Sequence, residues 1–138
     1  MLRGFDYVRA GSVNEGCALL AGNEGGAILA GGTDLLVNIR NNVVSPRLLV
    51  DLKGIDELSR LSFDGGVRIG ANVPLNAIAE NSVIREGYSA LGEAAGSVGS
   101  YQVRNRATLA GNQAGPRHPG RDPGKHIAWN TKNEDLIP

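Results

Sequence analysis

Cysteine, aromatic residues and long apolar runs are all scarce in this sequence. The single cysteine, Cys17, excludes an internal disulfide and a cysteine-rich zinc or iron–sulfur site, and we expect it to be a small buried apolar residue. No run of about 18 apolar residues exists that would predict a membrane span. The sequence starts without an apolar signal-peptide segment, so we expect a cytoplasmic location.

Excess charge of one sign is also lacking. Fourteen basic and fourteen acidic residues give a formal net charge of zero, which argues against a nucleic-acid partner. Aromatic residues make up 4% of the chain, so the core must be aliphatic. Glycine is abundant instead: 20 of 138 residues, about twice its usual share of roughly 7%. So much glycine predicts tight turns, or backbone that approaches a ligand closely.

The first part of the chain alternates between short apolar strands and helices. Strands are predicted at residues 5–9, 27–30 and 48–51, with helices at 13–20 and 34–41 between them. Ser12 and Glu15 match a capping box, in which the Ser12 hydroxyl accepts a free backbone N–H and Glu15 reaches back to Ser12. Val13, Cys17 and Leu20 are expected on one face of the first helix, the buried one. This order predicts an α/β lobe over residues 1–56, with at least partly parallel strands.

The pattern changes after residue 56. A β-hairpin is predicted at 61–70, around Asp64-Gly65-Gly66, followed by helices at 74–80 and 88–98. Small residues in the second of these helices predict close packing against its neighbours. These elements form a second, α+β lobe over residues 57–114, and residues 115–138 are predicted to be an irregular tail. No metal site is predicted, because neither the spacing of the two histidines nor a neighbouring cysteine supports one.

The first segment that points to a ligand is Ala30-Gly31-Gly32-Thr33-Asp34. A strand that ends in two glycines before a helix directs backbone N–H groups at one small volume, and the missing Cβ atoms let a phosphate approach the main chain. The alternative is a plain strand-to-helix turn in which Thr33 or Asp34 caps the helix. The spacing matches neither a Walker A loop nor a Rossmann fingerprint.

The second such segment runs from Gln102 to Asn112. Arg104 and Arg106 could neutralise a phosphate, although loop arginines are more often solvated. Thr108 offers a hydroxyl and Gly111 offers access to the backbone. Taken alone, the segment also fits an ordinary turn between secondary elements.

Taken in order, the two segments resemble those of the flavoprotein subunits of molybdenum hydroxylases, the family that includes xanthine dehydrogenase and aerobic carbon monoxide dehydrogenase. That family has a loop like Ala-Gly-Gly-Thr-Asp/His-Ser, followed later by one like Ile-Arg-Asn-x-Gly-Thr-Ile-Gly-Gly-Asn. Residues 5–7, 49–52, 55–58 and 67–71 also look like the family. The resemblance covers residues 4 to 112.

The resemblance implies a two-lobed FAD-binding fold of the PCMH type, similar to vanillyl-alcohol oxidase, that combines α/β and α+β lobes and lacks part of the second lobe. It implies FAD as the cofactor and no catalytic residue in this chain. The implied partners are a molybdopterin-binding large subunit and a two-cluster iron–sulfur small subunit, whose electrons the flavin relays to an external acceptor. The implied FAD contacts are Ala30, Gly31, Gly32, Thr33, Asp34, Val103, Ala107, Thr108, Leu109, Ala110, Gly111 and Asn112.

The chain departs from the family in two places. Ala107 and Ala110 stand where the family usually has glycine; alanine disfavours positive φ, which predicts an altered FAD affinity. After Asn112 the sequence stops matching, so we interpret the tail as non-family sequence from a truncated or frame-shifted gene. Two alternatives stay open: a truncated, non-catalytic fragment, or a flavoenzyme of the vanillyl-alcohol-oxidase or enolpyruvoylglucosamine-reductase type.

Overall fold

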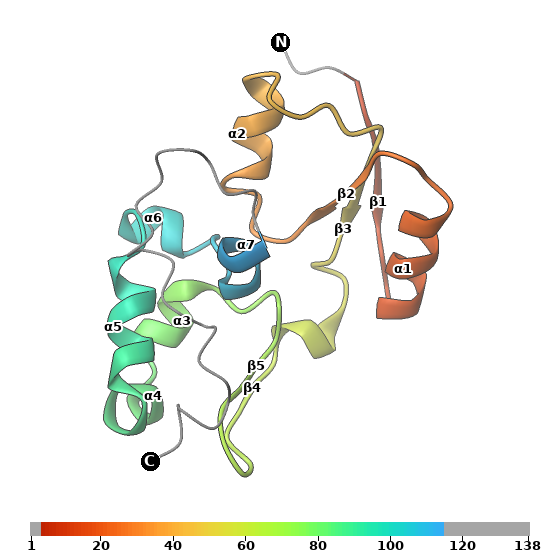
Figure 1. Ribbon diagram of the computed structural model, residues 1–138. Coiled ribbons are helices and arrows are strands. Elements are labelled where there is room, and N and C mark those ends of the chain that lie inside the picture. Colours follow the sequence, from red (N-terminus) through yellow and green to blue (C-terminus); the bar gives the residue numbers. More distant parts are fainter. Residues whose placement is uncertain (1–3, 115–138) are drawn as a thin grey trace.

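The computed structural model describes residues 4–114, and the predicted tail at 115–138 lies outside them. Two groups of elements follow one another along the chain (Figure 1). The first contains a three-stranded sheet, and the second contains a β-hairpin with a set of short helices. None of the helices in the described part of the chain is long and apolar enough to cross a membrane.

Three parallel strands form the sheet, in the order β1-β3-β2. They are β1 (Asp6–Arg9), β2 (Gly26–Leu29) and β3 (Leu48–Asp51). All four residues of the central strand β3 are buried, as expected for a parallel strand covered on both faces. The predicted parallel α/β arrangement is therefore confirmed.

Helix α1 (Val13–Ala21) packs on one face of the sheet, and α2 (Leu35–Arg40) follows β2. The Ser12 hydroxyl accepts the N–H of Glu15 at 3.1 Å, as the capping box predicts. The Glu15 carboxylate instead accepts the N–H of Gly11, at 2.7 Å. The Glu15 side chain therefore binds the N–H one residue before Ser12, the residue that the capping box predicts.

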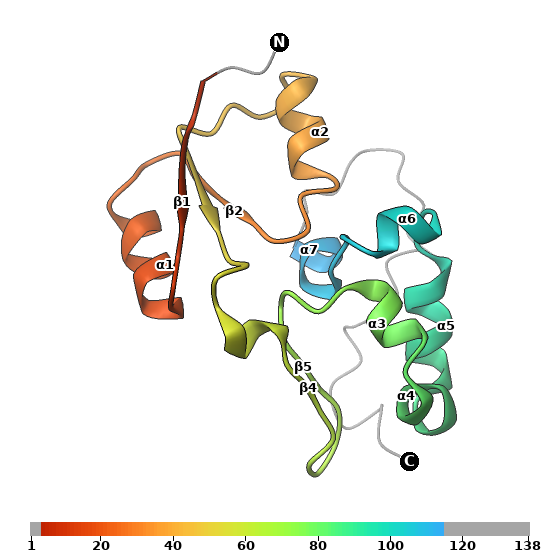
Figure 2. The same cartoon turned by 180° about the vertical axis from the view of Figure 1, so that it is seen from behind.

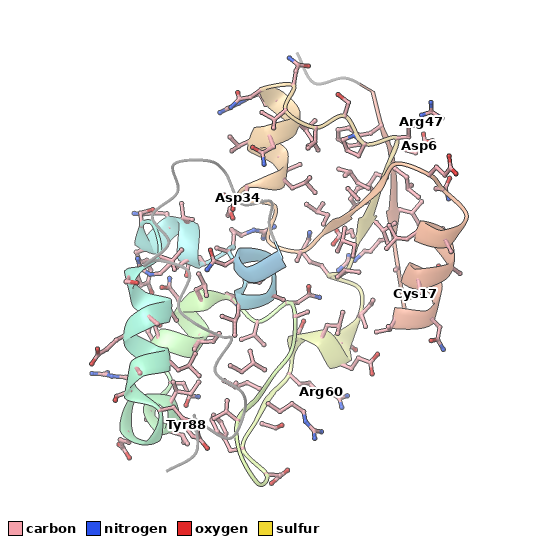
Figure 3. The ribbon with its side chains drawn as sticks, in the orientation of Figure 1. Asp6, Cys17, Asp34, Arg47, Arg60 and Tyr88 are labelled. Atoms are coloured by element: carbon pink, nitrogen blue, oxygen red, sulfur yellow. The ribbon has the colours of Figure 1, made fainter. Side chains whose placement is uncertain are left out.

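The predicted buried face of α1 is wrong for Val13 and Cys17, whereas Leu20 does pack against the core. Val13 and Cys17 are both exposed, and Figure 3 shows Cys17 on α1. The helix approaches the sheet at Gly16, where an added Cβ would lie 3.7 Å from the Ala10 side chain. The hydrophobic core on this side contains Ala10, Leu48, Val50 and Ile55, with Leu19 and Leu20 of α1 packed against it.

The second group begins with a 3₁₀ turn, η1 (Asp56–Ser59), which the sequence did not predict. The predicted hairpin follows as β4 (Leu61–Ser62) and β5 (Arg68–Ile69), which pair antiparallel. The predicted helices are α3 (Leu75–Ala79) and α5 (Ser89–Ser97), and an additional helix, α4 (Ser82–Gly87), lies between them. An added Cβ at Gly92 would lie 3.5 Å from Ile84 and one at Gly96 would lie 3.7 Å from Ala79, so small residues do permit close packing here.

The segment from Gln102 to Asn112 is not a simple turn. It contains most of α6 (Tyr101–Arg104) and the start of α7 (Leu109–Ala114). Ser100 caps α6 by accepting the N–H of Val103 at 3.3 Å, and Thr108 accepts the N–H of Gly111 at 3.0 Å in the first turn of α7. A hydroxyl side chain that accepts the backbone N–H three residues later stabilises the start of a helix. Two such residues explain why two short helices form here.

Candidate ligand site between the two glycine segments

The two glycine segments lie directly against each other. A Cβ added at Gly31 would overlap the carbonyl oxygen of Arg106 and lie 3.1 Å from the Cα of Ala107. Figure 2 shows α7 beside the loop that leads from β2 to α2. A bridge between Pro74 and Thr108 fixes the second segment to the start of α3. Glycine at position 31 is therefore needed for contact between the two loops.

Gly32 has a different structural role. Its φ of 76° lies in the left-handed region, which favours glycine. An added Cβ would also lie 2.9 Å from the side chain of Leu29 and 3.2 Å from that of Leu36. Asp34, labelled in Figure 3, precedes α2, but its side chain does not cap that helix. The alternative of a turn capped by Asp34 is therefore not supported.

A pocket of about 80 Å³ opens beside the contact between the two segments. Lys53 and Arg106 bring positive charge to its wall, and no acidic residue lines it. The lining residues are Ala30, Gly31, Lys53, Asn72, Pro74, Asn105, Arg106 and Thr108. A small pocket with two cations and several neutral polar groups suits an anion.

Three of the residues assigned from the sequence line this pocket: Ala30, Gly31 and Thr108. Ala107 is buried in the hydrophobic core beside them. The assigned residues that do not line the pocket are Gly32, Thr33, Asp34, Val103, Leu109, Ala110, Gly111 and Asn112.

The two alanines that replace family glycines cause no backbone strain. Asn42 is the only non-glycine residue with a positive φ in the described part of the chain, so neither Ala107 nor Ala110 needs the left-handed conformation. The methyl group of Ala107 packs in a core with Val73 and Leu75. An altered FAD affinity stays a prediction, and positive φ is not its cause.

Arg104 is held within the protein. Its Nε donates to Oδ1 of Asn76 at 2.9 Å, and its guanidinium also donates to the carbonyls of Val98 and Gly99. Asn76 in turn donates to Oδ1 of Asn105 at 2.8 Å and to a carbonyl of α6. This network fixes α6 to α3, which leaves Arg106 as the arginine of this segment that lines the pocket.

Asn72 brings an unsatisfied hydrogen-bond acceptor to the same pocket. Its Nδ2 donates to the carbonyl of Leu52 at 2.7 Å, whereas its Oδ1 is buried and has no hydrogen-bond partner. An unsatisfied buried acceptor costs about 1–3 kcal/mol.

Lys53 is positioned by a buried carboxylate. Asp51, at the end of β3, is 1% exposed and accepts a hydrogen bond from the Tyr7 hydroxyl. Its Oδ1 also accepts the backbone N–H of Lys53 at 2.8 Å and lies 2.9 Å from Nζ of Lys53. Burial raises the pKa of Asp51, but the hydrogen bonds from Tyr7 and Lys53 together outweigh it and hold the pKa below its usual range.

This lowered pKa predicts a loss of stability in acid. Because the folded-state pKa lies below the unfolded value of about 4, ionised Asp51 stabilises the fold above that pH, and this contribution disappears as the pH falls through the folded-state pKa. We expect Asp51→Asn to reduce the acid dependence of the unfolding free energy, measured by denaturant titration from pH 7 to pH 3. Asp64→Asn, at the exposed hairpin turn, is the matched control, and an equal reduction in both variants would contradict the assignment.

Comparison with known proteins points to one family. The family described as "FAD binding domain in molybdopterin dehydrogenase" matches residues 3–130, which extends beyond residue 112, where the motif resemblance ends. The xanthine dehydrogenase FAD-binding subunit of Escherichia coli O157:H7 is 35% identical over 108 residues, covering 77% of this chain and 37% of that protein. The carbon monoxide dehydrogenase medium chain of Hydrogenophaga pseudoflava is 36% identical over 120 residues, covering 86% of this chain and 42% of that protein.

Solved structures agree with these relatives. A carbon monoxide dehydrogenase from Hydrogenophaga pseudoflava matches with a TM-score of 0.78 at 32% identity, covering 81% of this chain and 40% of that chain. Quinoline 2-oxidoreductase from Pseudomonas putida 86 matches with a TM-score of 0.78 at 30% identity, covering 83% of this chain and 40% of that chain. The chain therefore spans about two fifths of the length of the relatives that it matches.

Proposed function

The chain belongs to the family of FAD-binding domains of molybdopterin dehydrogenases, and on that premise we propose that it binds FAD at the pocket between its two glycine segments. The observation that carries the proposal is the direct contact of Gly31 with Arg106 and Ala107. That contact brings two segments that are far apart in the sequence to one positively charged pocket.

Family membership and fold class agree with the sequence-based prediction. The matched structures confirm the two-lobed FAD-binding fold of the PCMH type for the part of it that this chain contains. The family match also favours the molybdenum hydroxylase lineage over the related vanillyl-alcohol-oxidase and enolpyruvoylglucosamine-reductase types.

The residues at the pocket fit the central part of FAD. Its diphosphate is an anion, which Lys53 and Arg106 would stabilise from the pocket wall. The two basic residues that line this pocket suit the charged part of the cofactor, so we assign only the diphosphate region to it.

When bound, FAD supplies the redox chemistry, taking electrons from iron–sulfur clusters and passing them to an external acceptor. The residues of this chain bind and orient the cofactor, and none is assigned as an acid or base. We propose that the chain works with a molybdopterin-binding large subunit and a two-cluster iron–sulfur small subunit. The relatives named as subunits or medium chains of dehydrogenases support such an assembly. The cytoplasmic location stays a prediction.

Calorimetric titration of the full 138-residue chain with FAD, with and without the two partner subunits, tests the proposal. We expect saturable binding of one FAD per chain, competition by ADP, and weaker binding of riboflavin, which lacks the diphosphate. The reason is that the diphosphate is the part of FAD assigned to the pocket. Heats equal to those of dilution under both conditions would favour the alternative, a non-catalytic fragment that holds no flavin.

A further inference from the structure

We propose that Lys53 is an additional ligand residue of this site, whose ammonium group binds the diphosphate of the cofactor and is positioned by Tyr7 and Asp51. The inference rests on the proposed FAD site and adds a residue that neither glycine segment contains. Lys53 lies after β3, at the boundary between the sheet and the second group of elements.

The Nζ atom of Lys53 contacts both the first glycine segment and Asp51. Nζ lies 3.3 Å from the carbonyl oxygen of Ala30, the first residue of the first glycine segment. It also lies 2.9 Å from Oδ1 of Asp51, and the side chain is 35% exposed. An ammonium group has three N–H donors. Two contacts within the protein leave one donor for a ligand in the pocket that Lys53 lines.

The lysine is also held in place before any ligand arrives. Asp51 is almost completely buried on the central strand, and the Tyr7 hydroxyl donates to its second oxygen from β1. Ordering a long, flexible side chain costs free energy when binding does it. Here Asp51 and the Ala30 carbonyl already restrict the lysine, so less of that cost falls on binding.

The charges of the groups around the pocket do not cancel. Asp51 alone would require one cation, and Lys53 provides it. Arg106 lines the same pocket, and no acidic residue among the lining residues pairs with it. Lys53, Asp51 and Arg106 together therefore have one more positive than negative charge, which favours binding of an anionic phosphate group.

Calorimetric titrations of the full chain with FAD, ADP and riboflavin separate a direct contact from an effect on folding. We expect Lys53→Met to weaken FAD and ADP about tenfold or more, because a charge-assisted hydrogen bond is lost, and to leave riboflavin unchanged. Lys53→Arg should retain most of the affinity. Tyr7→Phe should weaken FAD and ADP by less, about two- to fivefold, because it only loosens the position of the lysine. These differences should shrink at high salt.

Arg60→Met is the matched control, because Arg60 is exposed and does not line the pocket, and Figure 3 shows it well apart from Asp34. It should bind all three ligands like the wild type. Lys53→Gln, which keeps a donor for Asp51, replaces Lys53→Met if denaturant titration shows that variant to be unfolded. Unchanged FAD and ADP affinity, or an equal loss for riboflavin, would overturn the role of Lys53. A wild-type chain that binds neither FAD nor ADP would overturn the proposed function itself.

Discussion

Replacing Gly31 with alanine is expected to lower the free energy of unfolding by about 2–3 kcal/mol and to abolish FAD binding. The added methyl group would overlap the carbonyl oxygen of Arg106 and lie 2.9 Å from its carbonyl carbon. Both are backbone atoms, so no flexible side chain can move aside. The two glycine segments must separate, which opens the pocket that both of them line. Denaturant titration and FAD calorimetry measure the two effects.

Gly87→Ala is the matched control for this substitution. Gly87 is exposed at the end of α4, and no atom lies within 4 Å of an added Cβ. Alanine favours a helix over glycine by up to about 1 kcal/mol, so this variant should be as stable as the wild type or more stable. If Gly31→Ala binds FAD with wild-type affinity, the contact between the segments is not what forms the site.

Much of the first group of elements could be predicted because its signals are local. Residues 27–30 and 48–51 are apolar runs of strand length, and Ser12 with Glu15 marks a helix start. The observed strands β2 and β3 coincide with these runs to within one residue. Cys17 was misplaced because its burial depends on how α1 approaches the sheet, and that approach occurs at Gly16, a residue without a side chain to signal it.

The candidate site was only partly predictable for a related reason. Ala30, Gly31 and Thr108 belong to recognisable segments, whereas Lys53 and Asn72 belong to none. Lys53 lines the pocket while it is paired with Asp51 and donates to the Ala30 carbonyl, and Asp51 is itself held by the Tyr7 hydroxyl across the β1–β3 pair. Lys53 follows an apolar strand that ends in Asp51, but a lysine after a strand is usually a solvated surface residue. Tertiary contacts, not sequence spacing, distinguish it.

Gly31 and Gly32 have other structural roles than the one predicted from the sequence. Glycine was expected at positions 31 and 32 so that a phosphate could approach the main chain. In the structure, Gly31 faces the backbone of the other segment, and Gly32 adopts a left-handed conformation beside Leu29 and Leu36. Both glycines therefore shape the site, and the groups assigned to hold the ligand are the side chains around it.

Replacing Asn76 with leucine is expected to lower the free energy of unfolding by about 2–3 kcal/mol, because it removes three part-buried hydrogen bonds, one of them to the charged Arg104. Asn76 is 4% exposed, accepts from Arg104 and donates to Asn105. A leucine of similar size fills the space but satisfies neither partner. FAD affinity should fall as well, because Asn105 and the adjacent Arg106 line the pocket.

A double-mutant cycle with Arg104→Met tests whether these residues act as one network. We expect the double variant to be about 1–2 kcal/mol more stable than the sum of the single effects predicts, because each single change already breaks the shared hydrogen bond. Asn14→Leu, at an exposed position of α1, is the control and should change stability by less than about 0.5 kcal/mol. Additive effects of Asn76→Leu and Arg104→Met would show that Arg104 does not depend on Asn76, and would restore Arg104 as a candidate ligand for the diphosphate.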